Sequence, residues 1–166
     1  MLRKSLSFLF GATVLTSLSA TFATPSQAAE GVRFYCDNSG DVPTTVAYSY
    51  DTGYKTQVIR WVSDYFDYSG YDAYTRCSQV SRRFQSAYNE DRLDYVTAGV
   101  VNGQTVVCAT YAGGSCNSRN LLFTLKPGSN AGETLQRIFD VRDLGASALE
   151  ESSGRTYINF SQVLKK

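Results

Sequence analysis

The chain of 166 residues contains no histidine, and its only methionine is Met1. Histidine is the side chain used most often as a general base in catalysis and the commonest metal ligand. Its absence excludes Ser-His-Asp and Cys-His catalytic arrangements and the usual histidine-based zinc hydrolases. The most frequent kinds of hydrolytic site are therefore not available to this protein.

The chain also lacks a strong excess of either charge. It has 16 basic and 15 acidic residues, and two of the basic ones, Arg3 and Lys4, lie in an N-terminal segment that we expect to be removed. The remaining chain then carries a net charge of about −1 at neutral pH. This balance predicts neither nucleic-acid binding nor electrostatic attraction to an anionic membrane.

The N-terminus has the pattern of a secretory signal peptide. Arg3 and Lys4 precede an apolar stretch over about residues 6–18. This stretch is shorter than the ~20 residues that span a bilayer, which disfavours the alternative of a membrane anchor. Ser26 and Ala28 then give the small-x-small pattern that precedes a cleavage site.

We therefore predict that residues 1–28 are a signal peptide and that the mature chain begins at Ala29 or Glu30. Residues 29–166 have the length of a single domain. The protein is expected to be exported to the periplasm, the thylakoid lumen or the extracellular space.

The four cysteines follow the predicted signal peptide, and an even number in an exported chain predicts disulfides. Cys108 ends a β-like run and Cys116 follows a glycine pair typical of a turn, so we predict a Cys108–Cys116 bridge. Cys36 would then pair with Cys77 and join the first strand to the first helix. A zinc site of all four cysteines is the alternative, but no Cys-x-x-Cys pair occurs.

Strands are predicted where β-branched and aromatic residues alternate with polar ones. The expected strands span residues 32–37, 43–50, 56–62, 120–125 and 156–158, and a hairpin spans 94–110. Asn102-Gly103 forms the hairpin turn, because both residues tolerate positive φ. The nearly continuous apolar strand 120–125 is expected to be central in the sheet. Trp61 alternates with Ile59 on one strand face and is expected in the core.

A first helix is predicted to begin near Tyr74 or Thr75, capped by Asp72 or Thr75. Its apolar side chains recur at the three- and four-residue spacing of one buried stripe. The members of this stripe are Tyr74, Cys77, Val80, Phe84, Ala87 and Tyr88. The side chains on the opposite, solvated face are Arg76, Gln79, Arg82, Arg83 and Glu90.

A second helix is predicted over residues 131–144, because Asn130 and Glu133 resemble a capping box and Gly145 suits the end of a helix. Its inward side chains are expected to be Leu135, Ile138, Phe139 and Val141. Strands and helices do not alternate as βαβ units. The predicted fold class is α+β, with one antiparallel β-sheet and two packed helices in a single disulfide-stapled domain.

A tyrosine-rich loop over residues 63–73 separates the early strands from the first helix. We interpret its aromatic residues and their neighbour on the helix as the candidate binding surface; they are Tyr65, Phe66, Tyr68, Tyr71 and Tyr74. Tyrosine gives a large contact area at low entropic cost, and the intervening Ser, Gly and Asp add adaptable polar contacts. Such a loop suits a protein partner or a sugar ring. The alternative is that some rings pack on the sheet and the others are ordinary surface.

Catalytic and metal-binding patterns are sparse. Asp64, Asp67 and Asp72 lack the dense ligand order of a calcium loop. A glycosidase needs a pair of carboxyl groups, and the candidates are Glu133, Glu150 and Glu151. Glu133 is interpreted as a helix cap and the other two as exposed. We therefore predict no catalytic residues, no metal and no cofactor.

Several short segments follow one another in a distinctive order. They are residues 34–36, 43–46, 59–61, 76–84, 97–104, 107–108, 116, 122–125 and 127–128. This ordered set covers most of residues 32–145 and includes all four cysteines. It resembles the cyanobacterial circadian oscillating protein family, a group of exported domains.

The resemblance implies an exported protein with an association with the membrane periphery. It supplies no catalytic or binding residues, since no catalytic activity is established for the family. It also implies that the four cysteines are part of the structural framework. The expected function is that of a non-enzymatic accessory or binding protein whose partner is an unknown protein or glycan. The alternative is a carboxylate-dependent hydrolase, or a binder, of cell-envelope polysaccharide.

Overall fold

The computed structural model describes residues 31–139, 148–150 and 155–165. In chain order its elements are β1 (Val32–Asp37), β2 (Thr44–Ser49), β3 (Lys55–Arg60), η1 (Asp67–Ser69), α1 (Ala73–Asn89), β4 (Tyr95–Val101), β5 (Gln104–Thr110), β6 (Leu121–Thr124), α2 (Ala131–Ile138), β7 (Ala148–Glu150), β8 (Thr156–Asn159) and η2 (Phe160–Lys165). The strands predicted from the sequence are therefore present, with bounds that differ by one or two residues.

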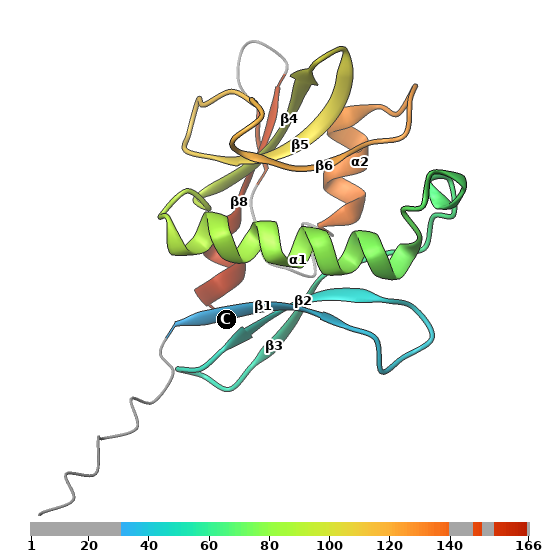
Figure 1. Cartoon of the computed structure of the whole chain (residues 1–166). Helices are drawn as coiled ribbons and strands as arrows, with labels where there is room; N and C mark the ends of the chain where they lie inside the picture. Colours follow the sequence, from blue (N-terminus) through green and yellow to red (C-terminus); the bar gives the residue numbers. More distant parts are fainter. Residues whose placement is uncertain (1–30, 140–147, 151–154, 166) are drawn as a thin grey trace, which may run out of the picture.

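The strands form two antiparallel sheets, with α1 lying between them (Figure 1). One sheet has the order β1-β2-β3, and the other has the order β6-β5-β4-β8-β7. The α+β class is confirmed, but the expected single sheet is divided in two. The reason is that α1 packs against both β1 and β6, so that the helix separates the first three strands from the rest.

Strand β6 lies at an edge of its sheet, and the expectation of a central strand was wrong. Its consecutive residues Leu122 and Phe123 are both buried although they point to opposite faces. The carbonyl of Leu122 accepts a hydrogen bond from Arg83 of α1, and the Phe123 ring lies against Trp61. An edge strand covered on both faces has the same apolar pattern as a central one.

The turn and cap signals give the structure that was predicted. Asn102 and Gly103 both have positive φ in the β4–β5 turn. The side chain of Asp72 accepts a hydrogen bond from the Thr75 backbone N–H at the start of α1, and Asn130 does the same for Glu133 at the start of α2.

The apolar stripe of α1 is confirmed from Cys77 to Ala87, but Tyr74 is exposed. The helix begins at Ala73, so Tyr74 lies in its first turn, at the end next to the projecting tyrosine-rich loop (Figure 1). Helix α2 ends at Ile138 with Phe139 as its C-cap, so it is shorter than the predicted range 131–144. Leu135 and Phe139 are buried as expected, and Ile138 is half-buried. Val141 and Gly145 lie outside the described residues.

One cluster of phenylalanine rings joins the three-stranded sheet to α1, to the end of α2 and to η2. The cluster consists of Phe34 of β1, Phe84 of α1, Phe139 after α2 and Phe160 of η2, and the centroids of its contacting rings lie 5.4–6.4 Å apart. All four side chains are buried. The two sheets and α1 therefore share a continuous hydrophobic core.

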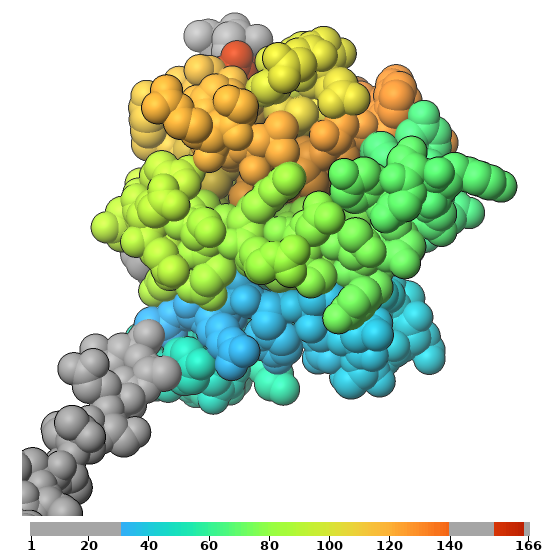
Figure 2. Space-filling model, viewed as in Figure 1, coloured from blue at the N-terminus to red at the C-terminus, as the bar shows by residue number. Residues whose placement is uncertain are grey.

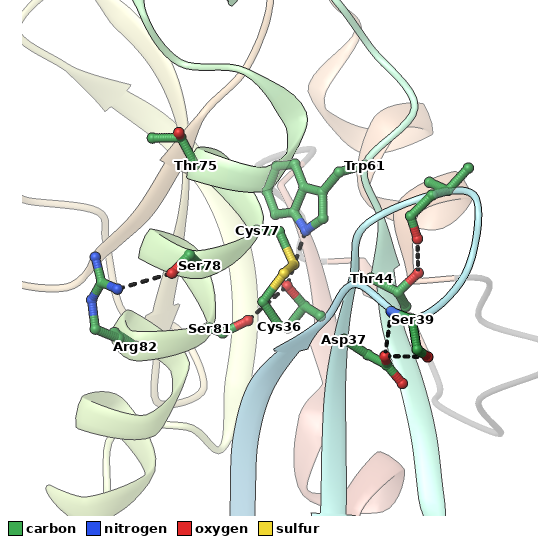
Figure 3. Close-up of a disulfide and its surroundings, with 12 residues drawn as sticks. Cys36, Asp37, Ser39, Thr44, Trp61, Thr75, Cys77, Ser78, Ser81 and Arg82 are labelled. Atoms are coloured by element: carbon green, nitrogen blue, oxygen red, sulfur yellow. Dashed lines mark hydrogen bonds between the residues drawn. A yellow bond between two sulfur atoms is a disulfide. The ribbon is translucent and has the colours of Figure 1, made fainter.

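Both predicted disulfides are present. Cys36 of β1 is bonded to Cys77 of α1, and Cys108 of β5 is bonded to Cys116 in the loop before β6. The first bridge fastens the three-stranded sheet to the central helix (Figure 3). Along the stretches that the structure describes, no helix is long and apolar enough to cross a membrane.

Candidate functional site

The tyrosine-rich loop has a defined backbone held by its own hydrogen bonds. The N–H groups of Ser69 and Tyr71 both donate to the Phe66 carbonyl, at 3.0 and 3.2 Å. The N–H of Gly70 donates to the Asp67 carbonyl at 2.9 Å, and Gly70 adopts φ 77°, a left-handed conformation that favours glycine. These bonds close the short η1 turn at the tip of the loop.

The loop presents its tyrosines to solvent and keeps its phenylalanine inside. Tyr68 at the tip is fully exposed, and Tyr65, Tyr71 and Tyr74 are 45%, 47% and 53% exposed. Phe66 is half-buried, and its ring lies edge-on to Tyr65 with centroids 4.9 Å apart. Figure 2 shows the loop, in green, projecting at one end of α1.

Arg76 of α1 fixes the base of the loop. Its guanidinium carbon lies 4.7 Å from the ring centroid of Trp61 and 4.7 Å from that of Phe66. Such cation–π contacts strengthen where water is excluded. Its Nη1 also donates to the Ser63 carbonyl at 3.3 Å. The guanidinium therefore joins the first part of the loop to the helix and to the core.

Burial lowers the pKa of the Arg76 guanidinium from its usual value, and the nearby Asp67 carboxylate opposes that shift. Arginine is charged throughout the range in which proteins are folded. The base of the loop therefore carries a partly desolvated positive charge.

Trp61, the ring beneath Arg76, is a core residue as predicted, with only 4% of its surface exposed. Its indole Nε1 donates to Thr45 Oγ1 at 3.0 Å, and the hydroxyl of Ser81 donates to the same oxygen at 3.1 Å. This buried network lies beside the Cys36–Cys77 bridge (Figure 3). The sheet, the helix and the start of the loop are thus held at one point.

A hollow of about 410 Å³ lies between the loop, α1 and the β5–β6 edge; we call it the α1–β6 hollow. The aromatic and polar side chains that line it include Phe66, Tyr71, Arg76, Gln79, Arg83 and Gln104. Two other hollows lie near β3, of about 170 and 1250 Å³. Among the described side chains that line these three hollows, every charged one is basic.

The arginines at the hollow were not predicted as site residues. Arg76 and Arg83 were expected on the solvated face of the first helix; Arg83 is exposed as expected, but Arg76 is half-buried. However, Arg83 Nη1 donates to the Leu122 carbonyl at 2.8 Å, which turns it toward β6. Helical spacing correctly excluded both from the buried stripe, but it carries no information about which loop or strand lies alongside that face.

The acidic candidates do not come together as a site. Asp72 is used as the cap of α1, and the hydrogen bonds from Thr75 hold the pKa of its carboxyl below the usual value. Within the described residues, no group of three or more His, Cys, Asp or Glu side chains could hold a metal ion. Glu133 lies in the first turn of α2, where a residue of the helix cap is expected. Glu150 lies in β7, and Glu151 lies outside the described residues.

The comparisons with known proteins give a family and nothing further. Neither a curated protein nor a solved structure matches the chain significantly. A family model described as circadian oscillating protein COP23 matches residues 33–165, a range that includes all four cysteines, the tyrosine-rich loop and the α1–β6 hollow. The chain therefore belongs to the circadian oscillating protein COP23 family, as its ordered motifs indicated.

Proposed function

We propose that this chain is an exported, non-enzymatic accessory protein that binds its partner through the tyrosine-rich loop. The observation that carries the proposal is the combination of exposed rings with a fixed backbone. Four tyrosines of the candidate surface are exposed, while Phe66 and Arg76 attach the loop to the core.

This combination is physically suited to binding. An exposed tyrosine ring contributes apolar area and a hydroxyl, and it has few rotatable bonds to immobilise. A loop that is ordered before it binds does not have to be ordered by its partner, so more of the contact energy appears as affinity. An ordinary solvated loop has no such concentration of exposed large rings.

Export is supported by the N-terminal signal pattern and by the two disulfides, which persist in oxidising compartments. The periplasm, the thylakoid lumen and the extracellular space all meet this requirement, and the family suggests the membrane periphery. Mass spectrometry of the native protein tests this part of the proposal, and we expect a mature N-terminus at Ala29 or Glu30. A native chain that still begins at Met1 would contradict it.

A non-enzymatic role is supported by the side chains that are present. The sequence has no histidine. A polysaccharide hydrolase needs two carboxyl groups across a cleft, about 5–10 Å apart. The described side chains lining the three hollows include no Asp or Glu. No observation therefore favours the hydrolase as a second candidate.

The proposal is tested by retention of partners from the native exported fraction on the immobilised mature protein. The test variant is Tyr68→Ala/Tyr74→Ala, which removes two exposed rings of the candidate surface. The matched control is Tyr54→Ala/Tyr111→Ala, because these tyrosines are 66% and 70% exposed but lie elsewhere. We expect the test variant to lose the retained protein or glycan and the control to keep it. Equal retention by both folded variants would remove the loop from the function.

A further inference from the structure

The α1–β6 hollow has two walls of different chemistry. The tyrosine-rich loop contributes the rings of Phe66 and Tyr71 on one side. The other wall is polar: α1 contributes Gln79 and Arg83, and the start of β5 contributes Gln104. A volume of about 410 Å³ is within the range of small-molecule sites, and the hollow is open to solvent.

Two guanidinium groups supply positive charge that no neighbouring carboxylate neutralises by direct contact. The one ion pair among the described residues joins Arg92 and Glu90, away from the hollow. Arg76 and Arg83 each donate to a backbone carbonyl, Ser63 and Leu122 respectively. A guanidinium has five N–H donors, so both arginines keep donors for a ligand.

The polar side chains of the hollow are also uncommitted. Gln79 and Gln104 make no side-chain hydrogen bond to other described residues. Each amide offers two donors and an acceptor, which is the capacity needed to bind paired hydroxyl groups. The adjacent rings of Phe66 and Tyr71 provide apolar surface on which the C–H face of a sugar ring can pack.

From these groups we infer that the α1–β6 hollow binds an acidic saccharide, a sugar ring that carries a carboxylate. The ring packs against Phe66 and Tyr71, its hydroxyls bond the Gln79 and Gln104 amides, and its carboxylate pairs with the guanidinium of Arg83. Arg76 adds positive charge at the base of the loop. The inference rests on the proposed function, since the loop forms one wall, and it names the ligand class.

Other ligands use this set of groups less completely. A neutral saccharide leaves Arg83 without a counter-charge, which is unfavourable for a group that ligand binding desolvates. An acidic peptide satisfies the charge but places no sugar ring on the aromatic wall. A site that binds acidic peptides alone would therefore fail to bind a charged saccharide, and that result would overturn the inference.

The test is calorimetric titration of the mature protein with trigalacturonate and with its methyl ester, which keeps the sugar and removes the charge. We expect saturable binding of the acid and at least about tenfold weaker binding of the ester, the loss typical of one charged hydrogen-bonded contact. Arg83→Gln should weaken trigalacturonate binding by about the same factor. Arg82→Gln is the matched control, because Arg82 is the neighbouring exposed arginine and, among the residues that the structure describes, its hydrogen-bond partner is Ser78 of its own helix.

Two results would overturn the inference. One is no binding of trigalacturonate to the folded wild-type protein, and the other is equal affinity for the acid and the ester. The ester comparison uses the wild-type chain, so it holds even if Arg83→Gln does not fold. If trigalacturonate fails to bind while Tyr68→Ala/Tyr74→Ala still abolishes partner retention, the saccharide inference fails and the proposed function stands.

Discussion

Trp61 is the residue at which the core and the tyrosine-rich loop meet. On one side its indole N–H is bonded to Thr45 inside the three-stranded sheet, and on the other its ring supports the Arg76 guanidinium. Arg76 in turn supports Phe66. A change at the buried end of this series is therefore expected to affect both stability and the position of the loop.

We predict that Thr45→Val destabilises the fold by about 1–3 kcal/mol, because two buried donors, Trp61 Nε1 and Ser81 Oγ, lose their common acceptor. Ser81→Ala should cost less, since Thr45 then still accepts from Trp61. Urea denaturation followed by Trp61 fluorescence measures both values. If the two variants are equally stable, the network is not organised around the Thr45 hydroxyl.

At the scale of elements, local signals predicted local structure. Asn102-Gly103 specified its hairpin and Asn130 its cap, because turn and cap chemistry depends on a few neighbouring residues. The division into two sheets and the edge position of β6 depend on contacts of α1 with distant strands. No pattern within a strand reports those contacts.

The candidate site shows the same difference between features that depend on neighbouring residues and features that depend on distant contacts. The tyrosines were recognisable from their local density, and four of the five candidate rings are exposed. The α1–β6 hollow was not predicted, because it forms only where the loop, Arg83 of α1 and the β6 edge come together. Its charge comes from arginines that helical spacing alone assigned to solvent.

The N-terminal cap of α1 gives a prediction about pH. Hydrogen bonds from Thr75 lower the pKa of the Asp72 carboxyl below its usual 3.8, so the folded state favours the carboxylate. This stabilisation is fully present above pH 3.8 and is lost as the pH falls through the lowered value. Asp72→Ala should therefore lower the urea midpoint at pH 7, and the difference from wild type should narrow below pH 3.8.

Asp51→Ala is the control for this measurement, because Asp51 is exposed in the β2–β3 turn and caps no helix. It should change the midpoint little at any pH. A difference between Asp72→Ala and wild type that stays constant down to pH 2 would show that the carboxylate charge does not contribute.

At the scale of the whole molecule, the two disulfides constrain different amounts of chain. Cys36–Cys77 spans 41 residues and joins a sheet to α1, whereas Cys108–Cys116 spans 8 residues within one edge of the other sheet. The phenylalanine cluster then connects β1 to η2 through the same helix. The long bridge is therefore the one that holds the three-stranded sheet to the rest of the protein.

We predict that Cys36→Ala/Cys77→Ala lowers the free energy of unfolding by about 4 kcal/mol and Cys108→Ala/Cys116→Ala by about 2.5 kcal/mol, from the entropy of the loops that the bridges close. Chemical denaturation of the two variants gives the comparison. A larger loss from the short bridge would mean that local packing around Cys116, rather than chain entropy, determines its contribution.

The central claim is that the tyrosine-rich loop is the surface at which this protein meets its partner. The most direct measurement is photocrosslinking in the native organism, with benzoylphenylalanine replacing Tyr68 at the loop tip or, as the control, Tyr111, which is also exposed but lies elsewhere. The account predicts a discrete cross-linked species from position 68 and none from position 111. A species from position 111 with none from position 68 would contradict it.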